Sequence, residues 1–556
     1  MTYHYTVRNI LVLGVISCLI WAMPSITHAQ NVKEILKAGK ISGSLQTDSQ
    51  IYFEDSVINA PDVEESLLSN TFLQLTYQNG GLTIGMRFEA YMNPLLGFDP
   101  RYQGIGVPYR FASYKGDKFE ITAGNFYEQF GSGQVLRAYQ EWMLGVDNSI
   151  DGVRIKYNPI KGLYLKGLIG KQRLYWERGE GIVRGLDAEA YLSDLFPKLA
   201  DSKVRVMLGG SFVSTFQKDN DPLLNLPENV AAFSGRTELR YKKFNLYGEY
   251  AYKVNDPSAS NRLNYNSGSA IYLRGAYSRK GLSVIFAAKR IDNMNFRSDR
   301  NATINDATLS FLPAITKAHT YRLPTLYPYA TQPNGEIGGQ IDVIYKIPKG
   351  SKLGGKYGTK IHLNYARING IDTTHVISGR TYEVPFFGEF RKNYFQDFNV
   401  EISRKFNKKY TGILKYINLT YDKNVIELGA PNLGADTVKA HIIIHEGRYK
   451  FNRKHSLRWE LQHMSTKEDL GSWAMALLEY SISPHWFFNL SDEWNYGNPD
   501  EGRRVHYYNV GFAYILKANR LSLSYGKQRA GLLCVGGICR VVPASNGFTF
   551  SYSTSF

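Results

Sequence analysis

The last ten residues of the chain alternate strictly between two kinds of side chain. The aromatic residues Phe548, Phe550, Tyr552 and Phe556 share one face with Thr554, and serine or threonine residues occupy the positions between them. A period of two is typical of a β-strand with one apolar and one polar face, whereas a helix would space its apolar residues three or four apart. The pattern therefore predicts a terminal strand.

The same alternation recurs along the chain. It is clearest in residues 82–90, 271–278, 361–366, 398–403, 457–462 and 508–516. The polar positions of these segments carry charges of both signs, as a water-filled lumen would allow. A charge that faces lipid in the middle of a membrane costs about 2–4 kcal/mol. The apolar face is therefore expected to contact lipid and the polar face to line a lumen.

The predicted connections alternate between short and long. The short set is 78–81, 115–118, 158–162, 241–243, 279–281, 407–409, 452–455, 483–484 and 517–520, with 195–202 and 348–358 as longer members. The long set includes 254–268, 292–335, 369–392, 422–437, 497–503 and 527–546. This asymmetry is typical of outer-membrane barrels, which have short periplasmic turns and long extracellular loops. A propeller would instead show a repeat of roughly 40–50 residues, and a sandwich has no reason to alternate its loop lengths.

These patterns predict an all-β protein, a transmembrane antiparallel β-barrel of about 24 strands within a range of roughly 18–24. An even number of strands places both ends of the barrel on the periplasmic side. Residues 39–556 are expected to form this single barrel domain.

The first residues have the pattern of an export signal. Arg8 supplies the positive charge, residues 10–23 are apolar, and Thr27-His28-Ala29 suits cleavage. We expect a cleaved signal peptide over 1–29 and a short periplasmic lead-in over 30–38. A lipoprotein signal at Cys18 is the alternative, but Cys18 lies inside the apolar run.

The chain ends on Phe556. A final alternating strand that ends in an aromatic residue resembles the C-terminal signal of bacterial outer-membrane barrels, which implies recognition of Phe556 by the barrel assembly machinery. An ordinary sandwich strand that ends in phenylalanine is the alternative interpretation of this segment alone.

Composition narrows the class of protein further. The mean hydropathy is −0.31, and no apolar run of about 18 residues follows the signal, so a helical membrane protein is excluded. The net charge is +17, but the basic residues do not gather into a stripe and no nucleic-acid motif occurs. We therefore expect no nucleic-acid partner. Outer-membrane lipid and anionic lipopolysaccharide account more simply for the charge.

Two cysteines remain after the signal is removed. Cys534 and Cys539 stand in Cys-Val-Gly-Gly-Ile-Cys, where a tight turn would allow a disulfide in an oxidising compartment. A zinc site is disfavoured because no histidine is near.

One dense segment, residues 124–152, departs from the alternation. Glycines, aromatics and charges crowd together there, and six charged residues are predicted to project into the lumen as a constriction: Glu128, Arg137, Glu141, Asp147, Asp151 and Arg154. A packed loop with a structural role is the alternative. Residues 128–149, 292–335 and 369–392 are each expected to fill part of a lumen that would otherwise be wide.

Several segments resemble one family. Gly124-Asn125-Phe126-Tyr127-Glu128, residues 144–153 and residues 534–543 are similar to a family of large Bacteroidota outer-membrane β-barrels labelled only as a domain of unknown function. The resemblance extends over nearly all of the chain after the signal. It implies a fold and an outer-membrane location in a Gram-negative bacterium, and it carries no catalytic or ligand residue.

Enzymatic motifs are not found. The 11 histidines are scattered, and neither His-x-x-Glu-His nor Gly-x-Ser-x-Gly occurs. The sequence predicts no enzyme, no cofactor and no metal site. An energised receptor is disfavoured because only residues 30–38 precede the first predicted strand.

The first functional hypothesis is a porin-like channel or transporter with loops that partly fill the lumen. The alternative is a non-transporting barrel scaffold, or an accessory subunit of a secretion or surface-protein complex with partners at its outer loops. A membrane-embedded hydrolase is the third and weakest hypothesis.

Overall fold

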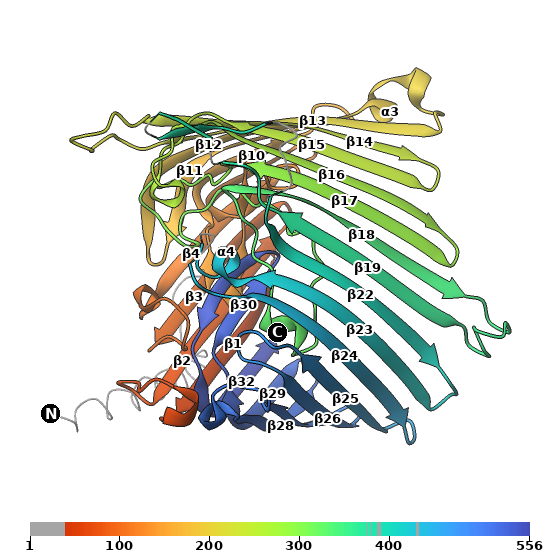
Figure 1. Cartoon of the computed structure of the whole chain (residues 1–556). Coiled ribbons are helices and arrows are strands. Elements are labelled where there is room, and N and C mark those ends of the chain that lie inside the picture. The colour runs from red at the N-terminus through yellow and green to blue at the C-terminus, as the bar shows by residue number, and fades with distance from the viewer. Residues whose placement is uncertain (1–38, 374, 379, 386–390, 430–432) are drawn as a thin grey trace.

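The computed structural model describes residues 39–556 apart from 374, 379, 386–390 and 430–432. The predicted signal peptide and lead-in lie outside the described residues. Within them, 24 strands form one antiparallel sheet that closes on itself (Figure 1). The strands are β1 (Lys40–Tyr52), β2 (Leu67–Asn79), β3 (Leu82–Met92), β4 (Gly104–Lys115), β5 (Phe119–Phe126), β10 (Ile150–Tyr157), β11 (Leu163–Leu174), β12 (Glu177–Tyr191), β13 (Val204–Phe216), β14 (Asn229–Tyr241), β15 (Phe244–Lys253), β16 (Gly268–Arg279), β17 (Leu282–Asp292), β18 (Gly335–Ile347), β19 (Thr359–Asn369), β22 (Asn393–Lys405), β23 (Tyr410–Asp422), β24 (Thr437–Lys450), β25 (His455–Ser465), β26 (Trp473–Ile482), β27 (Trp486–Trp494), β28 (His506–Leu516), β29 (Asn519–Gln528) and β32 (Ser545–Ser555). The predicted barrel of about 24 strands is confirmed.

The barrel closes where its first and last strands meet. β1 pairs with β32 from Ser44↔Ser555 to Tyr52↔Gly547. Beyond the last pair, Gly43 and Phe556 exchange backbone hydrogen bonds of 2.9 and 3.0 Å. A Cβ on Gly43 would come within 2.6 Å of the Phe556 ring, so glycine is required for the aromatic residue to lie over the seam. Closure pairs the first strand with the last, so the sheet has no terminal edge strand.

The connections follow the predicted asymmetry. At one end they are 80–81, 116–118, 158–162, 192–203, 242–243, 280–281, 348–358, 406–409, 451–454, 483–485 and 517–518, and the longest of these holds α3 (Leu192–Leu195) and η4 (Pro197–Leu199). The opposite end carries long loops, with the two-residue connection Tyr175–Trp176 between β11 and β12 as an exception. Figure 1 shows the long loops gathered at the left-hand end of the barrel.

The long loops contain small elements of their own. These are η1 (Ser56–Ile58), η2 (Pro100–Tyr102), β6 (Glu128–Gln129), β7 (Arg137–Ala138), β8 (Gln140–Glu141), η3 (Trp142–Leu144), β9 (Val146–Asp147), η5 (Ala259–Asn261), η6 (Pro324–Leu326), β20 (His375–Ser378), β21 (Thr381–Glu383), α4 (Lys423–Ile426), η7 (Glu501–Arg503), β30 (Gly531–Val535) and β31 (Ile538–Val542). None of the helices in the described part of the chain is long and apolar enough to cross a membrane.

The outer face of the sheet is apolar. Its exposed side chains include Ile84, Met86, Ile155, Leu186, Leu246, Leu273, Phe286, Leu414, Leu461, Leu490, Val510 and Phe550. All of them lie on the strand faces that the alternation assigns to lipid. A closed sheet with an apolar exterior satisfies its backbone within itself and suits a bilayer.

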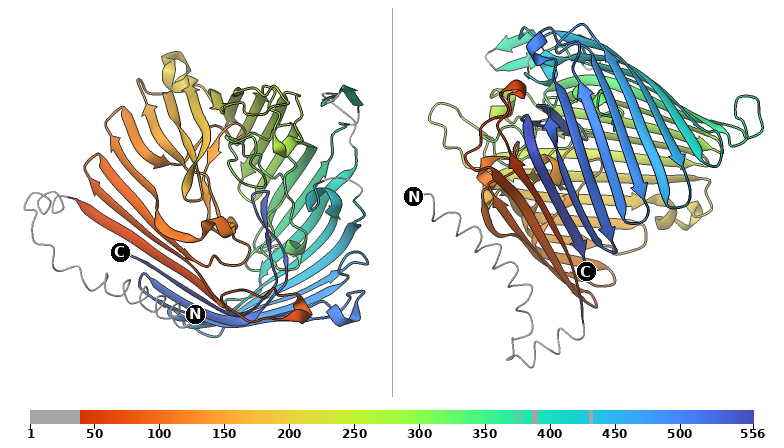
Figure 2. Two further views of the ribbon diagram at one scale, coloured as in Figure 1. Left: turned by 90° about the vertical axis from the view of Figure 1, so that its left-hand side faces the viewer. Right: turned by 90° about the horizontal axis from the view of Figure 1, so that it is seen from below.

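The inner face is less polar than the alternation predicts. On β24, Ile442 and Ile444 point inward and are fully buried, while Ile443 between them is 52% exposed on the outer face. They are buried because residues 293–334, the long connection from β17 to β18, lie inside the barrel. We call this segment the lumen plug; in Figure 2 it is the green chain inside the ring of strands.

Two apolar clusters attach the lumen plug to the wall. In the first, its Met294, Phe296 and Leu309 pack with Val183, Val213 and Ile291 of the inner wall. In the second, its Ile315, Tyr321, Leu323, Tyr327 and Tyr329 pack against inner residues of β19 and of β22 to β26. The inner face of the wall is therefore covered by the lumen plug along these strands.

Leu323 offers a test of this packing. It is fully buried in the second cluster, and Leu→Ala at a buried site costs about 2–5 kcal/mol. We expect Leu323→Ala to loosen the lumen plug, so that a protease cleaves within 293–334 while the barrel stays folded. Leu353→Ala, in a short-end connection and 71% exposed, is the matched control. Equal protease resistance of the two variants would contradict the packing.

Candidate functional site

The lumen plug is interlocked with a second inward segment, residues 127–149, which we call the inner loop. Arg137 donates its backbone N–H to the Leu309 carbonyl at 2.8 Å, and Phe311 donates to Gly133 at 2.9 Å. The Asn148 side chain donates to the Thr308 carbonyl at 2.8 Å. The two segments thus form one filling inside the barrel, as the sequence predicts for both of them.

A buried ion network holds the end of the inner loop to the wall. Asp147 accepts hydrogen bonds from Arg87 of β3 and from Arg173 of β11, the latter at 2.8 Å. Glu89 accepts from both arginines at 2.7 Å. Burial alone would raise the pKa of Asp147, but Arg173 and Arg87 hold it below the ordinary value. The network is balanced, with two carboxylates and two guanidinium groups, as buried charges require.

The start of the inner loop is held by a second network. Glu128 lies 3.0 Å from Lys166, 3.3 Å from Lys156 and 3.3 Å from Arg154. Arg154 also donates to Glu120 at 2.6 Å. The predicted pair Glu128 and Arg154 therefore meets inside the barrel, but as an anchor of the loop against β5, β10 and β11.

The other predicted constriction residues have separate positions. Arg137 stacks over Tyr139 and Phe311, 4.4 and 3.8 Å from the ring centroids. The carboxylate of Glu141 caps η3 by accepting the Met143 N–H at 3.2 Å. These residues, like the two networks, favour the alternative in which the inner loop is a packed structural element.

Asp151 does not point into the lumen. On β10 it shares a face with the exposed Val153 and Ile155, whereas Ile150 and Arg154 face inward. A strand has a period of two, so residues 151 and 154 lie on opposite faces. Asp151 instead contacts Arg178 at 2.8 Å and Arg110 at 3.7 Å on the outer wall.

The third predicted filling segment, residues 369–392, lies at the rim in its described part. Tyr382 of β21 donates to Asp292 at 2.8 Å, and its backbone contacts Asn266 of the neighbouring 254–267 loop. The described part of this segment packs on adjacent loops and not inside the lumen, contrary to the expectation that it fills the lumen.

A hairpin from the closing strands reaches the lumen plug. β30 and β31 pair between β29 and β32, and the predicted disulfide joins Cys534 to Cys539 within them. At the tip, Gly537 accepts the Thr331 N–H at 3.0 Å. Asn305 of the lumen plug donates to the Cys539 carbonyl at 3.0 Å. We call residues 529–544 the disulfide hairpin; it is the blue hairpin that crosses the interior in Figure 2.

Arg540 fixes the other side of the disulfide hairpin. Its guanidinium donates to the Met143 carbonyl at 2.8 Å and lies 4.3 Å from the Phe98 ring centroid. Burial lowers its pKa to about 10. The disulfide hairpin therefore joins three long loops: the lumen plug, the inner loop and residues 93–103.

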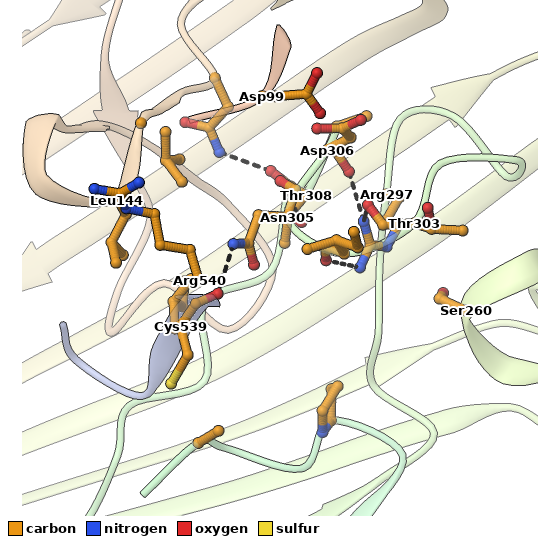
Figure 3. Close-up of a pocket in the computed structure, with 18 of the residues that line it drawn as sticks. Asp99, Leu144, Ser260, Arg297, Thr303, Asn305, Asp306, Thr308, Cys539 and Arg540 are labelled. Atoms are coloured by element: carbon orange, nitrogen blue, oxygen red, sulfur yellow. Dashed lines mark hydrogen bonds between the residues drawn. The ribbon is translucent and has the colours of Figure 1, made fainter. Parts of the chain in front are cut away.

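A cavity of about 790 Å³, the outer cavity, lies among these loops at the long-loop end. Figure 3 shows Asn305 directed at Cys539 across it, with Arg540 alongside. Arg297 donates to the carbonyls of Ile304 and Asp306 at 2.7 and 2.6 Å. Ile304 has a φ of 52°, which is a strained conformation for a β-branched residue, and these hydrogen bonds hold it there. The Ile304 side chain is 79% exposed.

A second cavity lies at the barrel seam. It measures about 500 Å³ and separates the lumen plug from the inner wall of β27, β28, β29, β32 and β1. We call this space the seam cavity and the five strands the seam wall. The residues that line it on the wall include Gln50, Ser491, Asn509, Gly526 and Thr549.

Charged side chains line the seam cavity on the seam wall, where Glu493 and Lys527 lie, and also on its other sides. Arg322 of the lumen plug lies 2.5 Å from Glu493. Arg458 is paired with Glu446 at 3.1 Å and Glu479 at 2.6 Å, and also with Glu460. The charged residues that line the cavity are three cations, Arg322, Arg458 and Lys527, and two carboxylates, Glu460 and Glu493, so its lining carries only a small net charge.

Among the described residues, no group of three or more histidine, cysteine, aspartate or glutamate side chains is placed to hold an ion.

The residues that shape the lumen were mostly not identifiable from the sequence. Arg87, Arg173 and Arg322 lie on ordinary strands or in a long loop, and no local pattern sets them apart. One available signal was the run Ile442-Ile443-Ile444, which is apolar on both strand faces and so indicates burial on both.

The buried network around Asp147 can be tested. Removing one partner of a buried ion network costs about 3–5 kcal/mol, so Asp147→Asn should release the inner loop at lower urea concentration, detected by cleavage within 127–149. Asp151→Asn, on the outer wall, should destabilise the protein less, because its partners Arg110 and Arg178 are more than half exposed. Equal effects of the two substitutions would contradict the assignment of faces.

The chain is similar to solved barrels at low sequence identity. The siderophore receptor PirA from Pseudomonas aeruginosa has a TM-score of 0.40 and 11% identity, over 93% of this chain and 80% of that one. OccAB4 from Acinetobacter baumannii has a TM-score of 0.33 and 9% identity, over 93% and 98%. The outer membrane protein opdK from Pseudomonas aeruginosa has a TM-score of 0.35 and 12% identity, over 77% and 97%. At these TM-scores the likeness does not extend to function.

No curated protein sequence matches the chain. Residues 7–556 match the family described as a family of unknown function, DUF6029. The match covers nearly the whole chain, including the inner loop, the lumen plug and the disulfide hairpin, and the protein therefore belongs to the DUF6029 family.

Proposed function

We propose that this protein is a passive, porin-like channel of the outer membrane, with its solute path along the seam wall. The observation that carries the proposal is the seam cavity, a polar space between the lumen plug and the wall. Loops fill most of the remaining cross-section at this level.

The filling can be followed around the barrel. Phe72 and Tyr91 of β2 and β3 are covered by Phe98 and Trp142. Inner residues of β5 and of β10 to β17 are covered by the inner loop and the lumen plug, and the lumen plug continues over β19 and β22 to β26. On the seam wall, the apolar contacts of the described residues centre on Tyr507, which packs against Ile58, Ala60 and Ala544 and also against Trp473 of the second cluster.

The chemistry of the path favours small, uncharged polar solutes. Hydroxyl and amide groups line the seam wall together with Glu493 and Lys527. The other sides of the cavity carry Arg322, Arg458 and Glu460. A solute can hydrogen-bond to either side, and neither side attracts one sign of charge strongly. A small apolar cluster of Ile58, Ala60 and Ala544 lies near the long-loop end of the seam wall.

The fold and the sequence support an outer-membrane setting for the channel. An apolar exterior with short turns at one end and long loops at the other is typical of barrels in the outer membrane of Gram-negative bacteria, and the resemblance to a Bacteroidota family points to that group. In this setting the long loops face outward, lipopolysaccharide surrounds them, and Phe556 is available to the barrel assembly machinery.

A second candidate function rests on the outer surface. Met143, Ile304 and Val541 are exposed apolar residues on the three segments that meet at the outer cavity. Exposed apolar groups at one location are typical of protein contact sites. This favours a scaffold or accessory subunit that docks a secreted or surface protein, without enzymatic activity.

Single-channel conductance in a planar bilayer tests the channel. Thr549→Cys places a thiol on the seam wall at the seam cavity. Ser553→Cys, on the same face of β32 but closer to the short-turn end, is the control. The native cysteines are joined in a disulfide and do not compete for a thiol reagent. We expect a bulky reagent to block most of the conductance of the Thr549→Cys variant and little of the Ser553→Cys variant.

Two outcomes would contradict this proposal. Equal block of both variants would place the path elsewhere in the lumen. A correctly folded barrel without conductance would overturn the channel and leave the scaffold, which crosslinking at Ile304 would then examine.

A further inference from the structure

Four cations gather on the outer wall of β4, β11 and β12. We call Arg110, Lys171, Arg178 and Arg184 the outer cation cluster. The Arg110 and Arg178 side chains are 54% and 57% exposed. They belong to the strand faces that carry apolar residues elsewhere, and so they face the surroundings of the barrel and not its lumen.

Their height on the wall is consistent from strand to strand. Going toward the long-loop end, Arg110 follows Ala112, Lys171 follows Ile169, and Arg184 follows Leu186, each two residues along the same face. Ile169 and Leu186 are exposed members of the apolar band. Arg110, Lys171 and Arg184 therefore lie at similar heights on the long-loop side of Ile169 and Leu186, and Arg178 lies further toward the long-loop end. We place the change from hydrocarbon to headgroups at this level.

Strand register brings the members together around Asp151. Arg178 and Arg110 both contact this carboxylate, at 2.8 and 3.7 Å, and Lys171 is its cross-strand partner. Arg184 is the partner of Ile169, next to Lys171 on the same face. Cross-strand neighbours have Cβ atoms about 4.5–5.5 Å apart, so one carboxylate faces several cations.

The wall is hollowed at the same place. β4 pairs with β5 only from Phe111↔Gly124 to Lys115↔Glu120, while β5 remains paired with β10 up to Phe126↔Ile150. The separation of β4 leaves a cavity of about 430 Å³, the outer notch. Arg110, Asp151 and Arg178 line it, together with Gly106, Val107, Pro108, Trp176 and Glu177.

The charges around the outer notch leave a net positive charge. Asp151 neutralises one of the four cations. Glu177, which also lines the notch, and Glu180 flank Arg178 on β12 and offset two more, so four cations face three carboxylates. Like charges this close repel one another, and an exposed basic group at the headgroup level attracts an anion.

We propose that the outer notch binds the phosphate group of a phosphorylated glycolipid headgroup in the outer leaflet. This inference rests on the outer-membrane location proposed above and is independent of conduction. Arginine suits the task because its planar guanidinium donates two parallel hydrogen bonds to phosphate. Arg110 and Arg178 flank the notch and would supply these bonds, while Lys171 and Arg184 would add charge.

Lipid binding to the detergent-solubilised full chain tests the proposal. The probe is monophosphorylated lipid A, compared with its dephosphorylated form and with inorganic phosphate. Loss of hydrogen bonds to a charged group should weaken the affinity of the Arg110→Ala/Lys171→Ala/Arg178→Ala variant roughly 10- to 100-fold. The control is Arg367→Ala/Lys439→Ala, which removes two outward cations on β19 and β24, far from the outer notch.

The outcomes separate the sources of phosphate. We expect the phosphorylated lipid to bind the wild-type and control proteins equally and the triple variant weakly. We expect the dephosphorylated lipid to bind all three proteins weakly. Equal affinity in all three proteins, or for both lipids, would overturn the proposal. Inorganic phosphate that binds as tightly as the lipid would overturn the assignment to a headgroup. Arg178→Ala alone serves if the triple variant does not fold.

Discussion

A strand in a bilayer must pair every backbone amide and carbonyl with a neighbouring strand, because lipid offers no hydrogen bonds. This requirement forces the sheet to close, and closure joins β1 to β32 across almost the whole length of the chain. Twenty-four strands enclose a lumen too wide for wall side chains to fill. The lumen plug and the inner loop follow from that width, since they occupy space that would otherwise be an open hole.

The barrel wall has two apolar surfaces in different surroundings. The outer surface faces lipid, whereas the inner clusters around Phe296 and Leu323 resemble the core of a soluble protein. Charges inside are tolerated because they are paired: Asp147 lies between Arg87 and Arg173, and Glu128 lies among three cations. Such networks hold the loops at defined positions on the wall and leave the seam wall as the uncovered side.

The sequence was sufficient for the fold because strand alternation and loop length are local properties. Strand number, the sides of the short and long connections, and the Cys534–Cys539 disulfide were all predicted. The site was harder. Asp151 was assigned to the lumen because alternation lapses in 124–152, and its face depends on where β10 begins. The ion partners of Asp147 come from strands β3 and β11, and only the closed sheet brings them together. Residues 369–392 are long enough to enter the lumen, but their contacts with residues 254–267 keep them at the rim.

The position of the disulfide hairpin has a consequence for assembly. The disulfide hairpin connects β29 to β32. The strand that closes the barrel is therefore directly continuous with a segment that contacts the lumen plug. The lumen plug connects two strands in the middle of the chain. We expect it to enter the lumen before β1 and β32 pair and close the barrel. Pairing of β32 with β1 and contact of the disulfide hairpin with the lumen plug would then occur together. A chain whose interior is wrongly packed would meet an obstacle at the seam, and the joint between β1 and β32 would serve as a checkpoint on the whole structure.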